Sequence, residues 1–270
     1  MDTVKCNLEY KTKCAKIDEK EKKVLSIEDV SKNIEFEFGK LAKQANFAVK
    51  VTSGGTSVLC CVVMNDKENR EIPQEPLVPL TVDYRERTYA AGKIPGGFFK
   101  REGKPREHEI HVSRLIDRTI RPLFPKDFNY DVQVNVLLLS FDPEHDPTIL
   151  SVLGTSLALS LSEIPFECFC SCFRLCKIGN EYIINPSYQE LEISDTDLIV
   201  SFFKDQILMI ENESNELKEE ELFKMVAYLQ TYARLFDEFQ QKVVDQYGKN
   251  KILYEKKFNL EELVKLNYDS

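Results

Sequence analysis

The chain has 270 residues, of which 43% are hydrophobic and 30% are charged, so it can form one large core with a smaller appended unit. No apolar run approaches the roughly 18 residues that a membrane-spanning helix needs. The N-terminus has neither the apolar segment of a signal peptide nor the Arg-rich bias of a transit peptide. We therefore expect a cytoplasmic protein that does not contact a membrane.

The chain begins with a charged segment and continues as an alternation of strands and helices. Residues 1–33 hold eight lysines and seven acidic residues with weak periodicity, which predicts an extension with at most a short helix. The predicted strands lie at residues 34–38, 47–52, 56–64, 77–84, 132–142, 174–178, 182–185, 198–203 and 207–211. The predicted helices lie at residues 107–120, 150–164 and 219–246. This order predicts an α/β (α+β) sandwich at residues 34–218, followed by an α-helical segment at residues 219–270.

Eight cysteines occur, and in a reducing compartment free thiols are expected rather than a disulfide framework. Four of them form a cluster: Cys168, Cys170, Cys172 and Cys176. A metal site is one interpretation, but the first three alternate with other residues, which is the period of a strand, and their spacing differs from that of a zinc knuckle. Buried strand cysteines are the favoured interpretation, and the role of the cluster stays open.

Basic residues concentrate in one part of an acidic chain. The net charge is −9, yet residues 81–126 hold eleven Lys and Arg against six Asp and Glu. In the helix predicted at residues 107–120, Arg114 and Arg118 lie on one stripe with Arg121, opposite the apolar face. A solvated basic face is the simple interpretation; a ladder of phosphate-binding guanidiniums is the functional one.

The loop before this helix combines aromatic and basic side chains between glycines. In "GGFFKREG", Phe98 and Phe99 precede Lys100 and Arg101. Adjacent rings and cations suit single-stranded nucleic acid, because bases stack on the rings while the cations hold phosphates. The alternative is that one ring packs inward and the loop only connects two elements.

Other candidates carry less weight. His108 and His111 are three residues apart at a helix start, but only one further histidine exists to complete a metal site. Asp195 and Asp197 sit in a turn-like "SDTD" that is typical of a strand boundary. No P-loop, dinucleotide-binding or hydrolase-elbow motif occurs. We therefore expect neither catalytic residues nor a metal site in this chain.

Taken in order, these motifs resemble a known family. The run "PLTVDYRERTYAAGKIPGGFFKREGKPREHEIHVSRLIDRTIRPLFP" and the later "GTSLALSLSEIPF" and "EYIINPSYQELEISDTDLIV" are similar to the first RNase PH-type core of the polyribonucleotide nucleotidyltransferase family. The later helix resembles the start of that family's helical linker domain. The resemblance implies an RNase PH-like, ribosomal-S5-domain-2-like βαβ sandwich. Departures fall in "ECFCSCFRLC" and "IVSFFKDQ", where the family has smaller residues.

The resemblance also implies a function. Family members degrade and process RNA, mRNA included, as 3′-to-5′ exoribonucleases that use inorganic phosphate as co-substrate and release nucleoside diphosphates. They form homotrimeric rings around single-stranded RNA, and Mg²⁺ is expected with ligands in a second core that these 270 residues do not contain. By this resemblance the aromatic-basic loop and the arginine stripe bind RNA, and nothing points to DNA.

Two functions are therefore open. One is a phosphorolytic nucleotidyltransferase in which this chain supplies the RNA-tracking first core, with the second core provided by a partner chain or a longer form of the protein. The other is a non-catalytic RNA-binding or ring-forming subunit of an exosome-like assembly. Whether the chain is a native product or a truncated fragment is not encoded in these residues.

Overall fold

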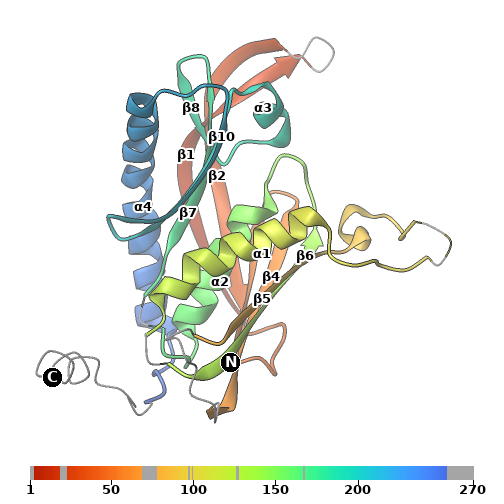
Figure 1. Ribbon diagram of the computed structural model, residues 1–270, viewed down its shortest axis with the longest axis vertical. Helices are drawn as coiled ribbons and strands as arrows, with labels where there is room; N and C mark the ends of the chain where they lie inside the picture. The colour runs from red at the N-terminus through yellow and green to blue at the C-terminus, as the bar shows by residue number, and fades with distance from the viewer. Residues whose placement is uncertain are drawn as a thin grey trace, which may run out of the picture.

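Two β-sheets pack around a central helix in the computed structural model (Figure 1). The structure describes residues 3–18, 23–68, 78–96, 98, 100–125, 128–166 and 168–253. The strands are β1 (Val4–Asp18), β2 (Lys23–Phe38), β3 (Phe47–Ser53), β4 (Thr56–Glu68), β5 (Leu80–Glu86), β6 (Tyr130–Ser140), β7 (Ser171–Ile178), β8 (Glu181–Ile184), β9 (Thr196–Phe203) and β10 (Gln206–Ser214). The helices are α1 (Glu107–Ile120), α2 (Pro147–Leu161), α3 (Tyr188–Ile193) and α4 (Glu219–Tyr247), with 3₁₀ turns η1 (Thr88–Ala91) and η2 (Arg121–Leu123).

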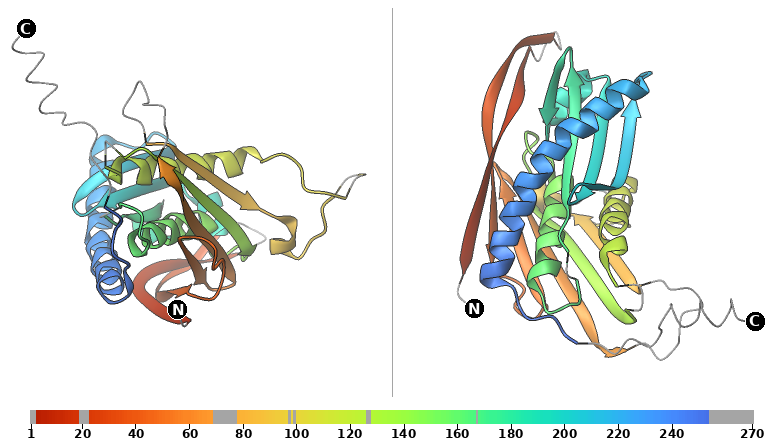
Figure 2. Two further views of the ribbon diagram at one scale, coloured as in Figure 1. Left: turned by 90° about the horizontal axis from the view of Figure 1, so that it is seen from below. Right: turned by 90° about the vertical axis from the view of Figure 1, so that its left-hand side faces the viewer.

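The sheets have simple strand orders. The first runs β1-β2-β3-β4-β6-β5, in which only β5 and β6 pair in parallel, and the second runs β10-β9-β7-β8 with antiparallel pairs throughout. Helix α2 packs against β3, β4 and β6 of the first sheet and against β7 of the second. Helix α4 runs beside α2 and contacts β1, β7 and β9 (Figure 2). The hydrophobic core therefore lies between the sheets, and the predicted α/β sandwich is confirmed.

Helix α2 is buried along its whole length, which explains its almost continuous apolar sequence. It begins earlier than predicted because Pro147 fits the first turn and the carboxylate of Asp146 accepts a hydrogen bond from the Thr148 amide at 2.9 Å. Gly154 lets the helix approach the first sheet closely. A Cβ at Gly154 would lie 2.6 Å from Cys60 Sγ and 2.6 Å from Val51 Cγ2.

The N-terminal segment is a strand rather than the expected extension with a short helix. Strands β1 and β2 form a long antiparallel hairpin on the edge of the first sheet, so the expected domain boundary after residue 33 falls inside β2. In β1 the buried Leu8 and Tyr10 alternate with the exposed Glu9 and Lys11. The strands were not predicted, since the sequence was interpreted as an extension with at most a short helix, because the lysines and glutamates mask a period-two pattern whose other face is buried.

This hairpin also joins the first sheet to the second. Thr12 Oγ1 donates to the Ile184 carbonyl at 3.3 Å and accepts from the Ile184 amide at 3.0 Å. The Ala15 amide donates to Glu190 at 2.6 Å, and the half-buried Lys32 ammonium donates to the Asn185 carbonyl, directly after β8, at 2.6 Å. Burial lowers the pKa of Lys32. The N-terminal residues are therefore part of the core.

The remaining elements follow the sequence closely, with two exceptions. Helix α1 has the predicted bounds, and α4 begins at Glu219 as expected. The predicted start of β5 lies outside the described residues. Helix α3 was not predicted, although Ser187 and Glu190 form a capping box that marks its start. Within the described ranges, no helix combines the length and the apolar character that a membrane span requires.

The clustered cysteines lie in β7 or just before it, and most of them are buried. Cys170, Cys172 and Cys176 are buried and Cys168 is half-buried, and β7 begins only at Ser171, after the first two. Burial raises the pKa of Cys170 and of Cys176 to about 12, so both remain thiols at neutral pH. The predicted alternation is blurred because both faces of β7 are covered. The role of the cluster as a whole stays a prediction.

Gly154 offers a test of the packing between α2 and the first sheet. We expect Gly154→Ala to lower the free energy of unfolding by about 1–3 kcal/mol, because the added methyl group overpacks the contact with Cys60 and Val51. Urea unfolding measures the change. Gly103→Ala is the matched control, since a Cβ there meets nothing within 4 Å. Equal stability of the two variants would show that α2 can shift away from the sheet.

Candidate nucleic-acid interface

Helix α1 is held against the edge strand β5 by two side chains of its first turns. Glu109, which is 5% exposed, accepts hydrogen bonds from the Arg106 amide at 2.6 Å and from the Glu86 amide at 2.8 Å. Ser113 Oγ accepts from the Tyr84 amide at 3.0 Å and donates to the Glu109 carbonyl at 2.9 Å. The sequence analysis did not identify these residues. The glutamate at the third helical position, a capping position, was the available signal.

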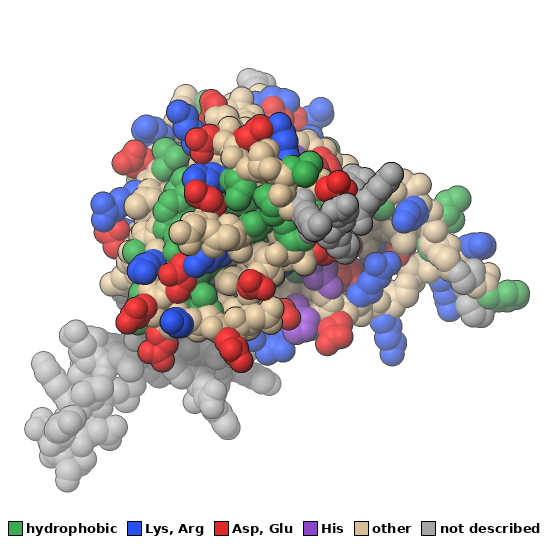
Figure 3. Space-filling view, turned by 90° about the horizontal axis from the view of Figure 1, so that it is seen from above, with side chains coloured by type: hydrophobic (Ala, Val, Ile, Leu, Met, Phe, Trp, Pro, Cys, Tyr) green, Lys and Arg blue, Asp and Glu red, His purple; other side chains and the backbone are tan. Residues whose placement is uncertain are grey.

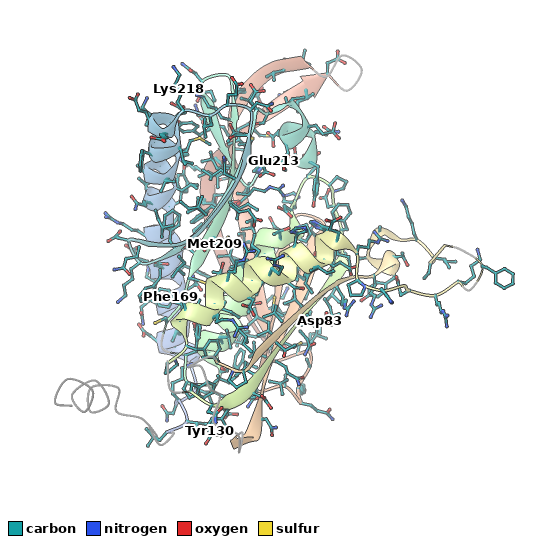
Figure 4. All side chains as sticks on the ribbon, in the orientation of Figure 1. Asp83, Tyr130, Phe169, Met209, Glu213 and Lys218 are labelled. Carbon is teal, nitrogen blue, oxygen red and sulfur yellow. The ribbon has the colours of Figure 1, made fainter. Side chains whose placement is uncertain are left out.

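This attachment fixes the direction of the predicted arginine stripe. Arg114 and Arg118 are exposed, as the helical period predicted, and line a hollow of about 390 Å³ between α1 and β5. Asp83 and Asp117 also line this α1–β5 hollow. Figure 4 labels Asp83 on β5, next to α1. The structure therefore confirms that these two guanidiniums point away from the apolar core.

The three carboxylates that line the α1–β5 hollow already have partners, Glu109 in the backbone amides described above and the two aspartates in arginines. Arg85 Nε lies 2.8 Å from Asp83, and Arg121 Nη2 lies 2.5 Å from Asp117. Among the residues that the structure describes, Arg114 and Arg118 form no ion pair. Like charges one helical turn apart repel each other, so an anion bound between these two guanidiniums would be stabilised.

Arg121 lies on the same stripe but has a different environment. Its Nε and Nη2 donate to Asp117, its Nη1 donates to the Val78 carbonyl at 2.7 Å, and its Nη2 also reaches the Leu80 carbonyl at 3.2 Å. The hydrogen bond with Asp117 raises the pKa of Arg121. Arg121 therefore braces β5 against α1, and its donors are directed at the protein itself.

The loop between η1 and α1 projects from the body of the molecule (Figure 1). Phe98 is 92% exposed, and both Lys100 and Arg101 are exposed. Phe99 lies outside the described residues. Lys and Arg side chains gather on this projection in the space-filling view (Figure 3). The Phe98 ring is thus not packed into the core.

The base of this loop is ordered by a carboxylate. Glu102 accepts hydrogen bonds from the Thr88 amide at 3.0 Å and from Thr88 Oγ1 at 2.9 Å, and these bonds lower the pKa of Glu102. The Lys93 amide donates to the Thr88 carbonyl at 3.0 Å, after Gly92 closes the turn in the left-handed conformation. The two ends of the loop are therefore tied together.

A separate hollow of about 490 Å³ lies between α1 and β10 and contains the histidine pair. His108 Nε2 lies 3.2 Å from Glu86, and this hydrogen bond raises the pKa of His108. His111 lies 3.8 Å from Glu107. Across the described residues, no three His, Cys, Asp or Glu side chains are close enough to hold a metal ion.

Two aspartates of the same region, Asp146 and Asp197, are neutralised by one arginine. Arg174 Nε and Nη2 donate to the two oxygens of Asp197 at 2.8 and 2.5 Å, and its Nη1 donates to Asp146 at 2.7 Å. Its side chain is 15% exposed, and the Asp146 side chain is 2% exposed. Asp197 lies in β9, directly after Thr196, its first residue, which agrees with the predicted strand boundary. Asp146 and Asp197 are therefore bound to a fixed cation.

Comparison with known proteins gives the family to which this chain belongs. Residues 31–165 match the 3′ exoribonuclease family, domain 1, and residues 168–228 match its domain 2. The chain belongs to this RNase PH family of 3′ exoribonucleases. The fold is similar to that of rice (Oryza sativa) Rrp46, with a TM-score of 0.63 at 13% identity, covering 78% of this chain and 94% of that one.

Several curated relatives carry one name. The chain is 44% identical over 222 residues to the polyribonucleotide nucleotidyltransferase of Persephonella marina, which covers 82% of this chain and 31% of the relative. It is 40% identical over 249 residues to that of Christiangramia forsetii, covering 92% of this chain and 32% of the relative. The chain thus spans about a third of the length of these relatives. The resemblance noted from the sequence is confirmed.

The three arginines of the stripe allow a direct comparison. We expect Arg121→Ala to lower the free energy of unfolding by about 2 kcal/mol, because it removes charge-assisted hydrogen bonds that join α1 to β5. Arg118→Ala should stay within about 0.5 kcal/mol of the parent protein, since its side chain is exposed and unpaired. Urea unfolding of both variants is the measurement. A larger loss for Arg118→Ala would contradict the assignment.

Proposed function

We propose that this chain is the first RNase PH-type core of a polyribonucleotide nucleotidyltransferase, a phosphorolytic 3′-to-5′ exoribonuclease, and that it supplies the surface along which RNA travels. The observation that carries the proposal is the exposed, unpaired pair Arg114 and Arg118 next to a projecting loop with an exposed ring and two cations. The relatives' names and the family support it.

Each predicted residue has a part in this proposal. Phe98, with its neighbour Phe99, offers a ring on which a base stacks, and Lys100 and Arg101 hold the flanking phosphates. Arg114 and Arg118 hold further phosphates of the same strand in bidentate fashion. Arg121, which the sequence places on the same stripe, acts through the protein by bracing the helix that carries the other two arginines. Recognition is of single-stranded RNA by backbone charge and stacking, not of DNA.

In the proposed reaction, inorganic phosphate attacks the terminal phosphodiester and a nucleoside diphosphate leaves. Such a displacement needs cations that bring two anions together and stabilise the charge that develops. Asp146 and Asp197 do not fit the Mg²⁺ expected for the family, because Arg174 neutralises both of them. We therefore assign bond breaking to a second core and RNA positioning to this one.

The proposed assembly is a homotrimeric ring in the cytoplasm that degrades mRNA, with the second core in a longer form of the protein or in a partner chain. An alternative of a different class is a non-catalytic RNA-binding or ring-forming subunit of an exosome-like assembly. The neutralised Asp146 and Asp197 agree with either role for this chain alone. Addition of a separate second-core fragment discriminates between them, since only the first role predicts restored phosphorolysis.

The loop gives the first test of RNA contact. We expect Lys100→Ala combined with Arg101→Ala to weaken binding of single-stranded RNA and to lower the slope of log affinity against log salt by about 1.4, or about 0.7 for each cation. Filter binding over a range of salt concentrations measures both quantities. The control pair Lys11→Ala and Lys43→Ala removes two exposed charges from β1 and from the segment after β2. Equal slopes for the two double variants would remove the loop from the RNA path.

The second test concerns activity. We expect the 270-residue chain alone to release no nucleoside diphosphate from poly(A) with Mg²⁺ and phosphate in excess, because its described residues bring no cluster of carboxylates together to hold a metal ion and Asp197 is bound by Arg174. Radiolabelled phosphate follows the reaction. Turnover by the purified chain would place the active site in this core and contradict the proposal.

A further inference from the structure

A second cationic hollow lies at the foot of the projecting loop, apart from the α1–β5 hollow. It has a volume of about 260 Å³ and is formed where β5 and β6 end, next to η1 and the start of α1. Its walls include Arg87, Lys93 and Arg106, and its floor includes Ala90, Leu138 and Phe141. We call this hollow the loop-foot pocket. The sequence analysis gave none of these six residues a role.

The three cations of the loop-foot pocket outnumber the two carboxylates beside them: Glu86 lines the pocket and attracts Arg106, and Glu102 attracts Arg87 and Arg106. Arg87 is half-buried, and Lys93 and Arg106 are exposed. Within the described part of the chain, none of the three forms an ion pair. The half-buried guanidinium of Arg87 has lost part of its hydration, and no ion pair with a described carboxylate compensates for this loss. A bound anion would therefore be favourable beside Arg87.

The neighbouring carboxylates are already engaged. Glu86, which also lines the pocket, accepts from Tyr84 Oη at 2.8 Å and pairs with His108 at 3.2 Å. Glu102 accepts two hydrogen bonds from Thr88, at 3.0 and 2.9 Å. The surplus positive charge of the pocket is therefore not removed by a small rearrangement of these two residues.

The floor of the pocket is apolar and firmly held. Ala90 is 8% exposed and Leu138 is 3% exposed, while Phe141 is half-buried. The Phe141 amide donates to the Ala90 carbonyl at 3.0 Å, and the Phe141 ring packs on Tyr188 with ring centroids 5.9 Å apart. The lining of the pocket thus combines a ring and aliphatic carbon with three cations. Nucleotides present this combination, an apolar base beside an anionic phosphate.

We propose that the loop-foot pocket is a binding subsite for one nucleotide unit, with its phosphate between Arg87, Lys93 and Arg106 and its base or ribose against Leu138 and Phe141. The volume lies near the lower end of small-ligand pockets, about 300 Å³, so it holds one unit rather than several. The proposed subsite rests on the proposed function in one respect, because RNA bound by the projecting loop would bring one of its nucleotides into the pocket. A free nucleoside diphosphate offers the same chemistry, and the experiment distinguishes the two sources.

The experiment uses the 270-residue chain with two ligands. Fluorescence anisotropy follows binding of a short fluorescein-labelled oligoadenylate over a range of salt concentrations, and isothermal titration calorimetry follows binding of ADP. The charge variants are Arg87→Gln and Lys93→Gln, and the floor variant is Phe141→Leu. Lys11→Gln on β1 is the matched control, because it removes one exposed positive charge outside the pocket.

If RNA supplies the nucleotide, each charge variant weakens oligoadenylate binding roughly three- to tenfold and lowers the salt slope by about 0.7, while Lys11→Gln leaves both unchanged. Phe141→Leu weakens binding roughly fivefold with the salt slope preserved, because it removes stacking and no charge. If a free nucleotide is the ligand, the same variants abolish ADP binding and leave the oligoadenylate curve as it was. Either pattern supports the subsite.

Two outcomes separate this proposal from the proposed function. If the loop variants at Lys100 and Arg101 lose RNA affinity while the Arg87 and Lys93 variants bind both ligands like Lys11→Gln, the loop-foot pocket is not a subsite and the RNA track stands. If the parent chain binds oligoadenylate without salt dependence, the RNA track fails, and the ADP titration alone then decides the pocket. Should Arg87→Gln not fold, as judged by its thermal melt, the exposed Lys93 gives the deciding variant.

Discussion

The burial of α2 between the two sheets is the constraint on which the rest of the molecule depends. Because every residue of this helix is buried, its position is set by both sheets at once. At Gly154 the backbone of α2 approaches the first sheet so closely that there is no space for a side chain. The first sheet, fixed in this way, presents β5 as its edge strand, and β5 is where α1 attaches. The cationic face is therefore rigid because the core behind it is closely packed.

Attachment of α1 to β5 converts a helical pattern into a surface. Glu109 and Ser113 supply hydrogen bonds to the backbone of β5, and Arg121 supplies two more to backbone carbonyls at its start. These polar ties fix the rotation of α1 about its axis, so Arg114 and Arg118 face the hollow instead of the core. A helix held by apolar contacts alone could rotate or slide with less cost.

The sequence predicted this fold well where the period was clear and poorly where charges hid it. Helix α1 has the predicted bounds because its apolar positions repeat cleanly and Pro122 follows its end. The strand β1 was missed because charged residues occupy six of its fifteen positions and mask the alternation, and burial of Thr12 depends on a contact with Ile184, far along the chain. A local pattern carries no information about such a partner.

The candidate site, like the fold, was predicted from the sequence only in part. Sequence placed Arg114, Arg118 and the loop cations on the surface, because helical period and glycine-rich composition report exposure directly. It could not separate Arg121 from its neighbours on the stripe, since two of its acceptors are the carbonyls of Val78 and Leu80, 43 and 41 positions earlier in the chain. The loop-foot pocket was also invisible, because its walls come from β5, β6 and α1 and meet only in the folded chain.

The arginines of this protein fall into two groups, and the difference between them bears on function. Arg174 and Arg121 are surrounded by acceptors that the fold provides, so their charge is used within the molecule. Arg87, Arg114 and Arg118 form no ion pair among the described residues, although the chain as a whole is acidic and Glu102 attracts Arg87 at longer range. With an excess of carboxylates available, these three cations stay unpaired around two hollows on either side of the start of α1. Such a distribution is stabilised by an external polyanion that contacts several cations at once, which is what a single strand of RNA provides.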